Sequence, residues 1–142
     1  MIVVAVAGVL ALVAYPTFMD SVRKSRRSEA VAALAQVQQS QERWRANNVS
    51  YADNAKLTVD PPNGLGIPAA TSSGLYALTI DAANANGYTA TATAVAGKSQ
   101  SHDTKCTVMR VRLDRANIQY GGCTNCAVPD GALTDPDRCW SR

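Results

Sequence analysis

Four cysteines are the residues of this sequence most able to form covalent or metal bonds, and all lie in its last 37 positions. They are Cys106, Cys123, Cys126 and Cys139. An even number of cysteines in a turn-rich terminal segment favours disulfides formed in an oxidising compartment. Four cysteines allow three pairings. We favour Cys106–Cys139, which would close a long loop, with Cys123–Cys126 as a local pair.

Two other uses of these cysteines stay open. Cys123-x2-Cys126 could bind zinc together with Cys106 and Cys139, but four-thiolate sites with paired spacing carry that spacing at both ends. A redox centre at Cys123 and Cys126 is less favoured, because the motif lies in a tail without a βαβ pattern. We therefore expect disulfides and no bound metal.

A basic cluster is the second group of residues that could bind a ligand. Arg23, Lys24, Arg26 and Arg27 follow residues 1–19, which contain no Asp, Glu, Lys, Arg or His. Such a cluster could contact the phosphates of DNA or of anionic lipid headgroups. Because no aromatic residues interleave the cluster, we favour a solvated helix face or contacts with acidic groups of neighbouring chains. DNA binding is an alternative that we do not favour.

Residues for catalysis are not grouped in any pattern that we can identify. His102 is the only histidine and lies in a polar loop, where a solvated ring is expected. Asp130, Asp135 and Asp137 could bind calcium, but their spacing matches no EF-hand loop. The net charge of +3 does not by itself imply a nucleic-acid partner. We expect a protein that is not an enzyme and that has no cofactor.

The apolar N-terminus predicts a helix that needs an apolar environment. Residues 1–14 read MIVVAVAGVLALVA, and with residues 15–19 they approach the length of a tilted membrane span. A helix that is apolar all round needs protein or lipid on every side, and the remaining chain is too small to surround it. A cleaved signal peptide is the alternative, although no basic segment precedes the apolar run. The residues expected in a filament core or membrane are Met1, Ile2, Val3, Val4, Val6, Val9, Leu10, Leu12 and Val13.

Gly8 and Pro16 weaken this helix. Proline removes one backbone hydrogen bond and clashes with the previous turn, and glycine has low helix propensity. We expect a kink or a short melted stretch between these two residues.

Residues 17–47 contain no glycine or proline and should continue the helix. Helical spacing places one apolar face against a headpiece; its members are Ala30, Ala33, Leu34, Val37, Gln41 and Trp44. The opposite face carries Arg26, Arg27, Gln38, Gln39, Glu42, Arg43 and Arg45. The helix would then cover one face of a soluble domain.

The period changes from helical to alternating in the second half of the chain. After a loop at residues 49–73, strands are predicted at 75–82, 87–95, 104–113 and 118–120, with a hairpin turn at 84–87. The predicted fold is α+β: a long N-terminal helix on a three- to four-stranded antiparallel sheet. Residues 1–21 would form a hydrophobic stem, and residues 22–142 a globular headpiece.

Several segments, taken in order, match one family. They are the apolar start, Tyr15-Pro16, residues 21–30 (SVRKSRRSEA), residues 41–44 (QERW) through Asn48, Tyr51-Ala52, residues 87–89 (GYT), and Cys106 with Cys139-Trp140. This sequence resembles type IV pilins, and most of all the PilE-type minor pilins of Gram-negative bacteria. The resemblance covers nearly the whole chain.

The resemblance implies a lollipop-shaped subunit that waits in the inner membrane and then joins an extracellular pilus used for adhesion, twitching motility or DNA uptake. Its partners would be other pilin subunits and the pilus assembly machinery, and a Cys106–Cys139 disulfide would close its exposed C-terminal loop. The family's peptidase cleavage site and the acidic residue after it have no counterpart here. We expect the sequence to begin a few residues inside the mature pilin, so N-terminal methylation maps onto no residue.

Two alternatives share the predicted architecture. One is a pseudopilin of a type II secretion system, and the other is a membrane-anchored periplasmic binding module. The charge distribution also conflicts with the family, because basic residues 23–27 would by themselves favour a cytoplasmic headpiece. Disulfides require a headpiece outside the cytoplasm. The family's leader normally carries basic residues of its own on the cytoplasmic side, which would remove this conflict.

Overall fold

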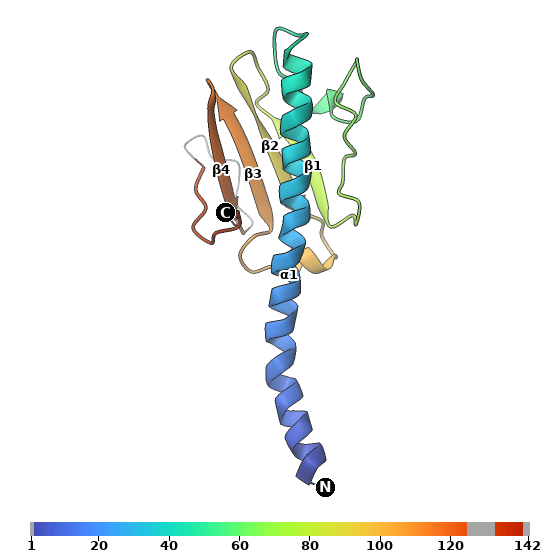
Figure 1. Cartoon of the computed structure of the whole chain (residues 1–142), viewed down its shortest axis with the longest axis vertical. Helices are drawn as coiled ribbons and strands as arrows, with labels where there is room; N and C mark the ends of the chain where they lie inside the picture. Colours follow the sequence, from blue (N-terminus) through green and yellow to red (C-terminus); the bar gives the residue numbers. More distant parts are fainter. Residues whose placement is uncertain (1, 125–132, 141–142) are drawn as a thin grey trace.

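The computed structural model describes residues 2–124 and 133–140. One helix, α1 (Ile2–Arg45), runs 44 residues, and its N-terminal part projects well beyond the sheet as a stem (Figure 1). Its C-terminal part lies along the sheet and forms, with it, the head. No helix in the described part of the chain has the length and apolarity that a membrane crossing requires.

Four antiparallel strands form a single sheet in the order β1-β2-β3-β4. They are β1 (Tyr76–Asp81), β2 (Gly87–Ala94), β3 (Val108–Asp114) and β4 (Asn117–Cys123). Two short 3-10 helices, η1 (Asn54–Lys56) and η2 (Ser99–His102), flank the first hairpin in the sequence. The predicted α+β fold, with a long helix on an antiparallel sheet, is confirmed.

The core lies between α1 and the inner face of the sheet. Alternate residues of a strand share a face, and the register places Ala90 opposite Val111 and Ala92 opposite Met109 on this inner face. All four side chains are buried, together with Leu34 of α1. The small alanine side chains of β2 leave room for the helix to lie close to the sheet.

The head has two ends, one next to the stem and one opposite it (Figure 1). We call the end next to the stem the base; it comprises residues 20–27 of α1, η2, residues 103–106 and residues 135–140. We call the opposite end the tip; it comprises residues 46–52, which follow α1, and the two hairpin turns, residues 82–86 and 115–116. A backbone hydrogen bond of 3.1 Å from Tyr51 to Asn84 joins these tip segments.

Both edges of the sheet are covered. Beside β1, the amide of Leu78 donates to the carbonyl of Ala69, and the amide of Ile80 donates to Asn54 Oδ1. Beside β4, the amide of Gly122 donates to the carbonyl of Thr134. The backbone groups of the edges are therefore partly satisfied within the chain, which disfavours pairing of this sheet with another.

The third and fourth strands differ from their predicted bounds. The third begins at Val108 rather than at residue 104, because Asp103 Oδ1 accepts the amides of Lys105 and Cys106 at 3.0 and 3.2 Å and holds this segment in a turn. The fourth is longer than predicted and extends to Cys123. The first two strands are each within one residue of their predicted ends.

The stem helix passes through Gly8 and Pro16 without interruption. The expected alternative of a melted stretch is therefore wrong. Proline lacks only its own amide donor, so the hydrogen bonds of the flanking turns can hold the helix together. The kink at this position stays a prediction.

Candidate functional site

The base is organised around an ion pair between α1 and the segment after η2. Arg27 Nε and Nη2 donate to the two carboxylate oxygens of Asp103 at 2.7 and 2.8 Å. Only 12% of the Arg27 side chain and 2% of the Asp103 side chain are exposed. Burial raises the pKa of Asp103, but the hydrogen bonds from Arg27 and from two backbone amides outweigh it and hold the pKa below its usual value. Arg27, predicted on the outer face, thus turns toward the head; that placement was wrong.

A buried amide extends this contact. Gln100 of η2 is fully buried, and its Nε2 donates to Tyr76 Oη at 2.8 Å and to the carbonyl of Arg23 at 3.3 Å. Arg26 donates to Ser99 Oγ. Residues 23–27, little more than one turn of α1, are therefore joined by polar contacts to η2 and the segment after it.

A disulfide joins Cys106 to Cys139 and confirms that predicted pair. It also contradicts the zinc alternative, because two of the four thiolates are used. Gly122 of β4 permits the approach, since a Cβ at that position would lie 2.4 Å from Cys139 Cβ. The predicted Cys123–Cys126 pair lies outside the described residues.

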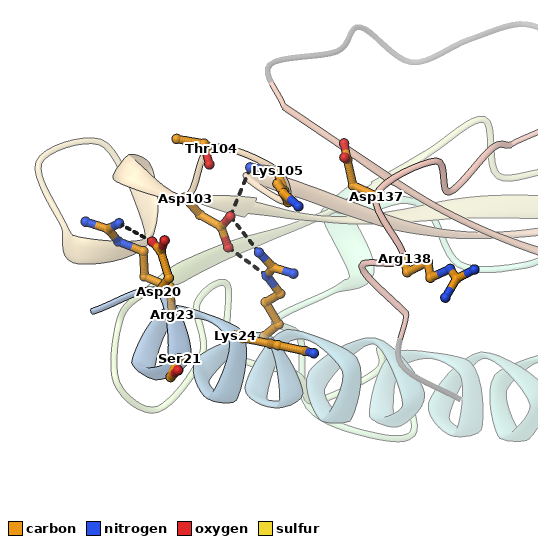
Figure 2. A pocket seen from close by; sticks show the side chains of 10 residues that line it. Asp20, Ser21, Arg23, Lys24, Asp103, Thr104, Lys105, Asp137 and Arg138 are labelled. Carbon is orange, nitrogen blue, oxygen red and sulfur yellow. Dashed lines mark hydrogen bonds and ion pairs between the residues drawn. The ribbon is translucent and has the colours of Figure 1, made fainter. Parts of the chain in front are cut away.

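A pocket of about 370 Å³ opens at the base, between the stem and the head. Figure 2 shows Asp20, Arg23 and Lys24 entering from α1, with Lys105 and Arg138 on the segments opposite. Its full lining is Asp20, Ser21, Arg23, Lys24, Arg27, Asp103, Thr104, Lys105, Asp137 and Arg138. Three of the four cations singled out in the sequence thus meet two further cations from the head.

The buried contacts of the tip are made by neutral groups, while the partly exposed Arg45 donates to the carbonyl of Asn48 at 2.7 Å and lies over the ring of Tyr51. Gln41 is fully buried; its side chain donates to the carbonyl of Ala52 at 2.8 Å and accepts the Ala52 amide at 2.9 Å. Beside it, the rings of Tyr51 and Tyr88 lie 5.0 Å apart. Burial raises the pKa of Tyr88, and nearby Glu42 adds to the effect.

A second pocket, of about 440 Å³, lies at the tip between the two hairpin turns. Asn84 Oδ1 accepts the amides of Asn86 and Gly87 at 2.7 and 3.2 Å, and the amide of Arg115 donates to the carbonyl of Asn86 at 3.0 Å. Arg115 has a positive φ of 46°, a conformation that is costly for a side-chain-bearing residue. The turns are fixed to one another, while Asn84, Asn86 and Arg115 remain exposed.

Among the residues that the structure describes, the histidine and the aspartates singled out in the sequence do not come together in one site. His102 is exposed, with its Nδ1 3.3 Å from Ser101 Oγ. The carboxylate of Asp135 accepts the amides of Cys139 and Trp140 at 2.7 and 3.0 Å, which fixes the segment that carries the disulfide. Asp137 lines the base pocket, and Asp130 is outside the described residues. Residues 2–124 and 133–140 contain no cluster of three or more potential metal ligands.

No local sequence pattern marks Asp103 or Gln100 as a contact of α1, or shows that the two tip turns lie together. Their partners lie far away in sequence; Arg27 and Asp103, for example, are 76 residues apart. The nine stem residues expected in a filament core all lie among residues 1–17, whose side chains are outside the description.

Comparison with known proteins identifies the family. A family model described as type IV minor pilin ComP, DNA uptake sequence receptor, matches residues 16–110, about two-thirds of the chain. The match begins at Pro16 in the stem and ends within β3, so it spans most of α1 and the first hairpin. A search of curated proteins finds no match. The long projecting helix, the four-stranded head and this match agree, and the chain belongs to the ComP family of type IV minor pilins.

Proposed function

We propose that this chain is a non-enzymatic minor pilin that rests in the inner membrane through its stem, joins an extracellular pilus, and binds DNA at the tip of its head. The observation that carries the proposal is the projecting helix α1, whose residues 2–19 contain no Asp, Glu, Lys, Arg or His. Burial of this surface among lipids and then among other stems would drive assembly, since apolar surface is stabilised by removal from water. Residues 22–142 would form the head that the filament displays.

The assembly step can be tested in sheared filaments. Leu10→Arg places a charge in the middle of the stem, where burial of an unpaired cation is costly. We expect the variant to be at least about tenfold depleted from filaments, which corresponds to about 1.4 kcal/mol. The matched control, Leu10→Ile, keeps the apolar surface and should assemble normally. Normal incorporation of the arginine variant would contradict the proposal, and it would favour a membrane-anchored module that never polymerises.

DNA binding at the tip is supported by the description of the family and by the chemistry of the tip pocket. The pocket is lined by Asn84, Asn86, Arg112 and Arg115 among other residues. Asparagine amides and arginine guanidiniums are the groups that most often read adenine and guanine. The tip is also the end of the head farthest from the stem (Figure 1), where a duplex would meet no neighbouring stem.

The DNA proposal predicts a local effect of Arg115. In the full chain held in detergent micelles, Arg115→Gln should weaken duplex binding about fivefold to a hundredfold, the range for losing one base or phosphate contact. If Arg115 contacts a phosphate, its loss should reduce the slope of log K against log salt concentration by about one. If it contacts a base, its loss should relax the sequence preference. Lys105→Gln removes an exposed cation at the base and is the matched control. Equal weakening by both variants would contradict a tip site.

A further inference from the structure

We propose that the base pocket binds the phosphate of an anionic phospholipid headgroup while the chain waits in the membrane. This inference rests on the membrane stage of the proposed function and gives that stage a specific contact. The pocket lies at the opposite end of the head from the tip turns and belongs to neither the sheet core nor the proposed DNA site.

The height of the pocket along α1 matches the headgroup region. A helix rises 1.5 Å per residue, so residues 2–19 of α1, which carry no charged side chain, cover about 27 Å of a hydrocarbon core that is about 30 Å thick. The next residues, Asp20 to Lys24, form the stem side of the pocket. A stem embedded to its first charged residue therefore brings the pocket to the level of the lipid phosphates.

The charge of the pocket favours an anion. Five cationic side chains line it against three carboxylates, which leaves a net charge of +2. Asp103 neutralises Arg27 inside the structure, and Asp20 contacts Arg23 at 3.0 Å near the surface. Lys24, Lys105 and Arg138 are exposed, and within the described ranges none of them has an ion pair. Asp137 is the one remaining carboxylate of the lining.

The disulfide brings two of these cations together. Lys105 directly precedes Cys106, and Arg138 directly precedes Cys139, so the bond between the cysteines joins two basic positions that are 33 residues apart in sequence. The turn at Asp103 and the Asp135 carboxylate fix the backbone on the two sides of the bond. A preformed arrangement reduces the ordering cost of binding.

The size of the pocket also fits a headgroup. Its volume of about 370 Å³ falls in the range of about 300–1,000 Å³ that small-ligand sites occupy. One wall comes from α1 where the stem enters the head, and the other from residues 103–105 and 137–138, so an occupant would contact both (Figure 2). Lipid binding would then orient the head relative to the bilayer before assembly.

Isotope-labelled full-length protein in nanodiscs can test this proposal by NMR. Discs of phosphatidylcholine alone are compared with discs that contain increasing phosphatidylglycerol. We expect saturable shifts of the amides of Ser21 and Thr104, which line the pocket, and no shift at Asn86 of the tip. Basic residues near anionic membranes contribute about 1 kcal/mol each, so Lys105→Gln should raise the phosphatidylglycerol fraction needed for half the shift roughly fivefold. Arg115→Gln is the charge-matched control and should leave this phosphatidylglycerol fraction unchanged.

The outcomes separate this inference from the proposed function. If the protein enters both kinds of disc and no shift depends on phosphatidylglycerol, the lipid site is wrong and the pilin proposal stands. If the protein enters neither disc, the membrane stage itself fails. Inorganic phosphate, added to phosphatidylcholine discs, should produce little shift; saturation by free phosphate with no further effect of the lipid would overturn the lipid assignment. Shifts of Ser21 and Thr104 by duplex DNA in place of lipid would overturn it as well.

Discussion

At the base of the head, a buried ion pair and a covalent bond join the helix to the segments around η2 and the C-terminal segment, whereas the buried joining groups of the tip are neutral and the charged contact of Arg45 there is partly exposed. The base has the buried Arg27–Asp103 pair and the Cys106–Cys139 disulfide. The tip has the amide of Gln41 bonded to the backbone and two tyrosine rings that pack at a tilt of 50°. The two ends of one small domain should therefore respond differently to acid, to reductant and to mutation.

The difference agrees with the positions of the two ends. The base lies beside the stem, where cations meet a membrane surface in our account. The tip is the free end, where rigid turns present exposed amides and Arg115. Each prediction below changes one end and uses the other end, or a matched residue, as its reference.

The largest effect is expected from breaking the buried ion pair. Asp103→Ala would leave the Arg27 guanidinium buried without its partner, and this should lower the free energy of unfolding by about 3–5 kcal/mol. Asp20→Ala removes the aspartate of an exposed pair, whose carboxylate side chain is 73% exposed, and should cost less than about 1 kcal/mol. Urea unfolding of the full chain in detergent, followed by tryptophan fluorescence, measures both. Equal costs would mean that the base is not fixed by this pair.

Removal of the base disulfide should have the next largest effect. The cysteines are 33 residues apart, and the entropy of closing such a loop predicts a loss of about 3–4 kcal/mol for Cys106→Ser with Cys139→Ser. Amide hydrogen exchange should increase at Lys105 and Trp140 much more than at Ala52 of the tip. Uniform acceleration at both ends would show that the disulfide stabilises the whole head without a local role.

A smaller effect is expected at the tip. Gln41→Leu keeps the apolar contacts of the side chain but leaves the buried amide and carbonyl of Ala52 without partners, which should cost about 2 kcal/mol. Gln39→Leu, on the exposed face of the same helix, should change the free energy of unfolding by no more than about 0.5 kcal/mol. The same urea measurement applies. If Gln41→Leu has no cost, the neutral contact does not hold the tip.

The pH dependence should separate the two ends with the smallest change in stability. The pKa of Asp103 is lower in the folded state, so its contribution is present above the unfolded pKa of about 3.9 and is lost as the pH falls through the folded pKa. The pKa of Tyr88 is raised, so its contribution is present below about 10 and is lost as the pH rises through its folded pKa. In acid, hydrogen exchange should accelerate first at the base. In alkali it should accelerate at the tip and also around Tyr76, which bonds Gln100 of the base and whose pKa is likewise raised by burial. Acceleration first at the tip in acid would contradict the assignment of the buried ion pair to the base.

The sequence predicted the elements whose signals are local. Helical spacing identified the buried face of α1, and alternation with a turn at residues 84–87 identified the first hairpin. The start of the third strand was missed because Asp103 holds residues 103–106 in a turn, and its partner Arg27 lies on another element. Propensity alone contains no information on such a distant contact.

The candidate sites were predicted only in part for the same reason. The cations of residues 23–27 were visible as a run, but their convergence with Lys105 and Arg138 depends on the disulfide and on the packing of α1. The tip pocket needs two hairpin turns to lie side by side, which follows from the register of β2 with β3. Neither arrangement can be inferred from residues that are close to one another in the sequence.

Hydrogen exchange of the full-length protein in phosphatidylglycerol-containing nanodiscs, with and without duplex DNA, tests the division between base and tip most directly. Our account predicts that the membrane protects the amides of Ser21 and Thr104, and that added DNA protects those of Asn86 and Arg115 without changing the base. DNA-dependent protection at the base, with the tip unaffected, would contradict it.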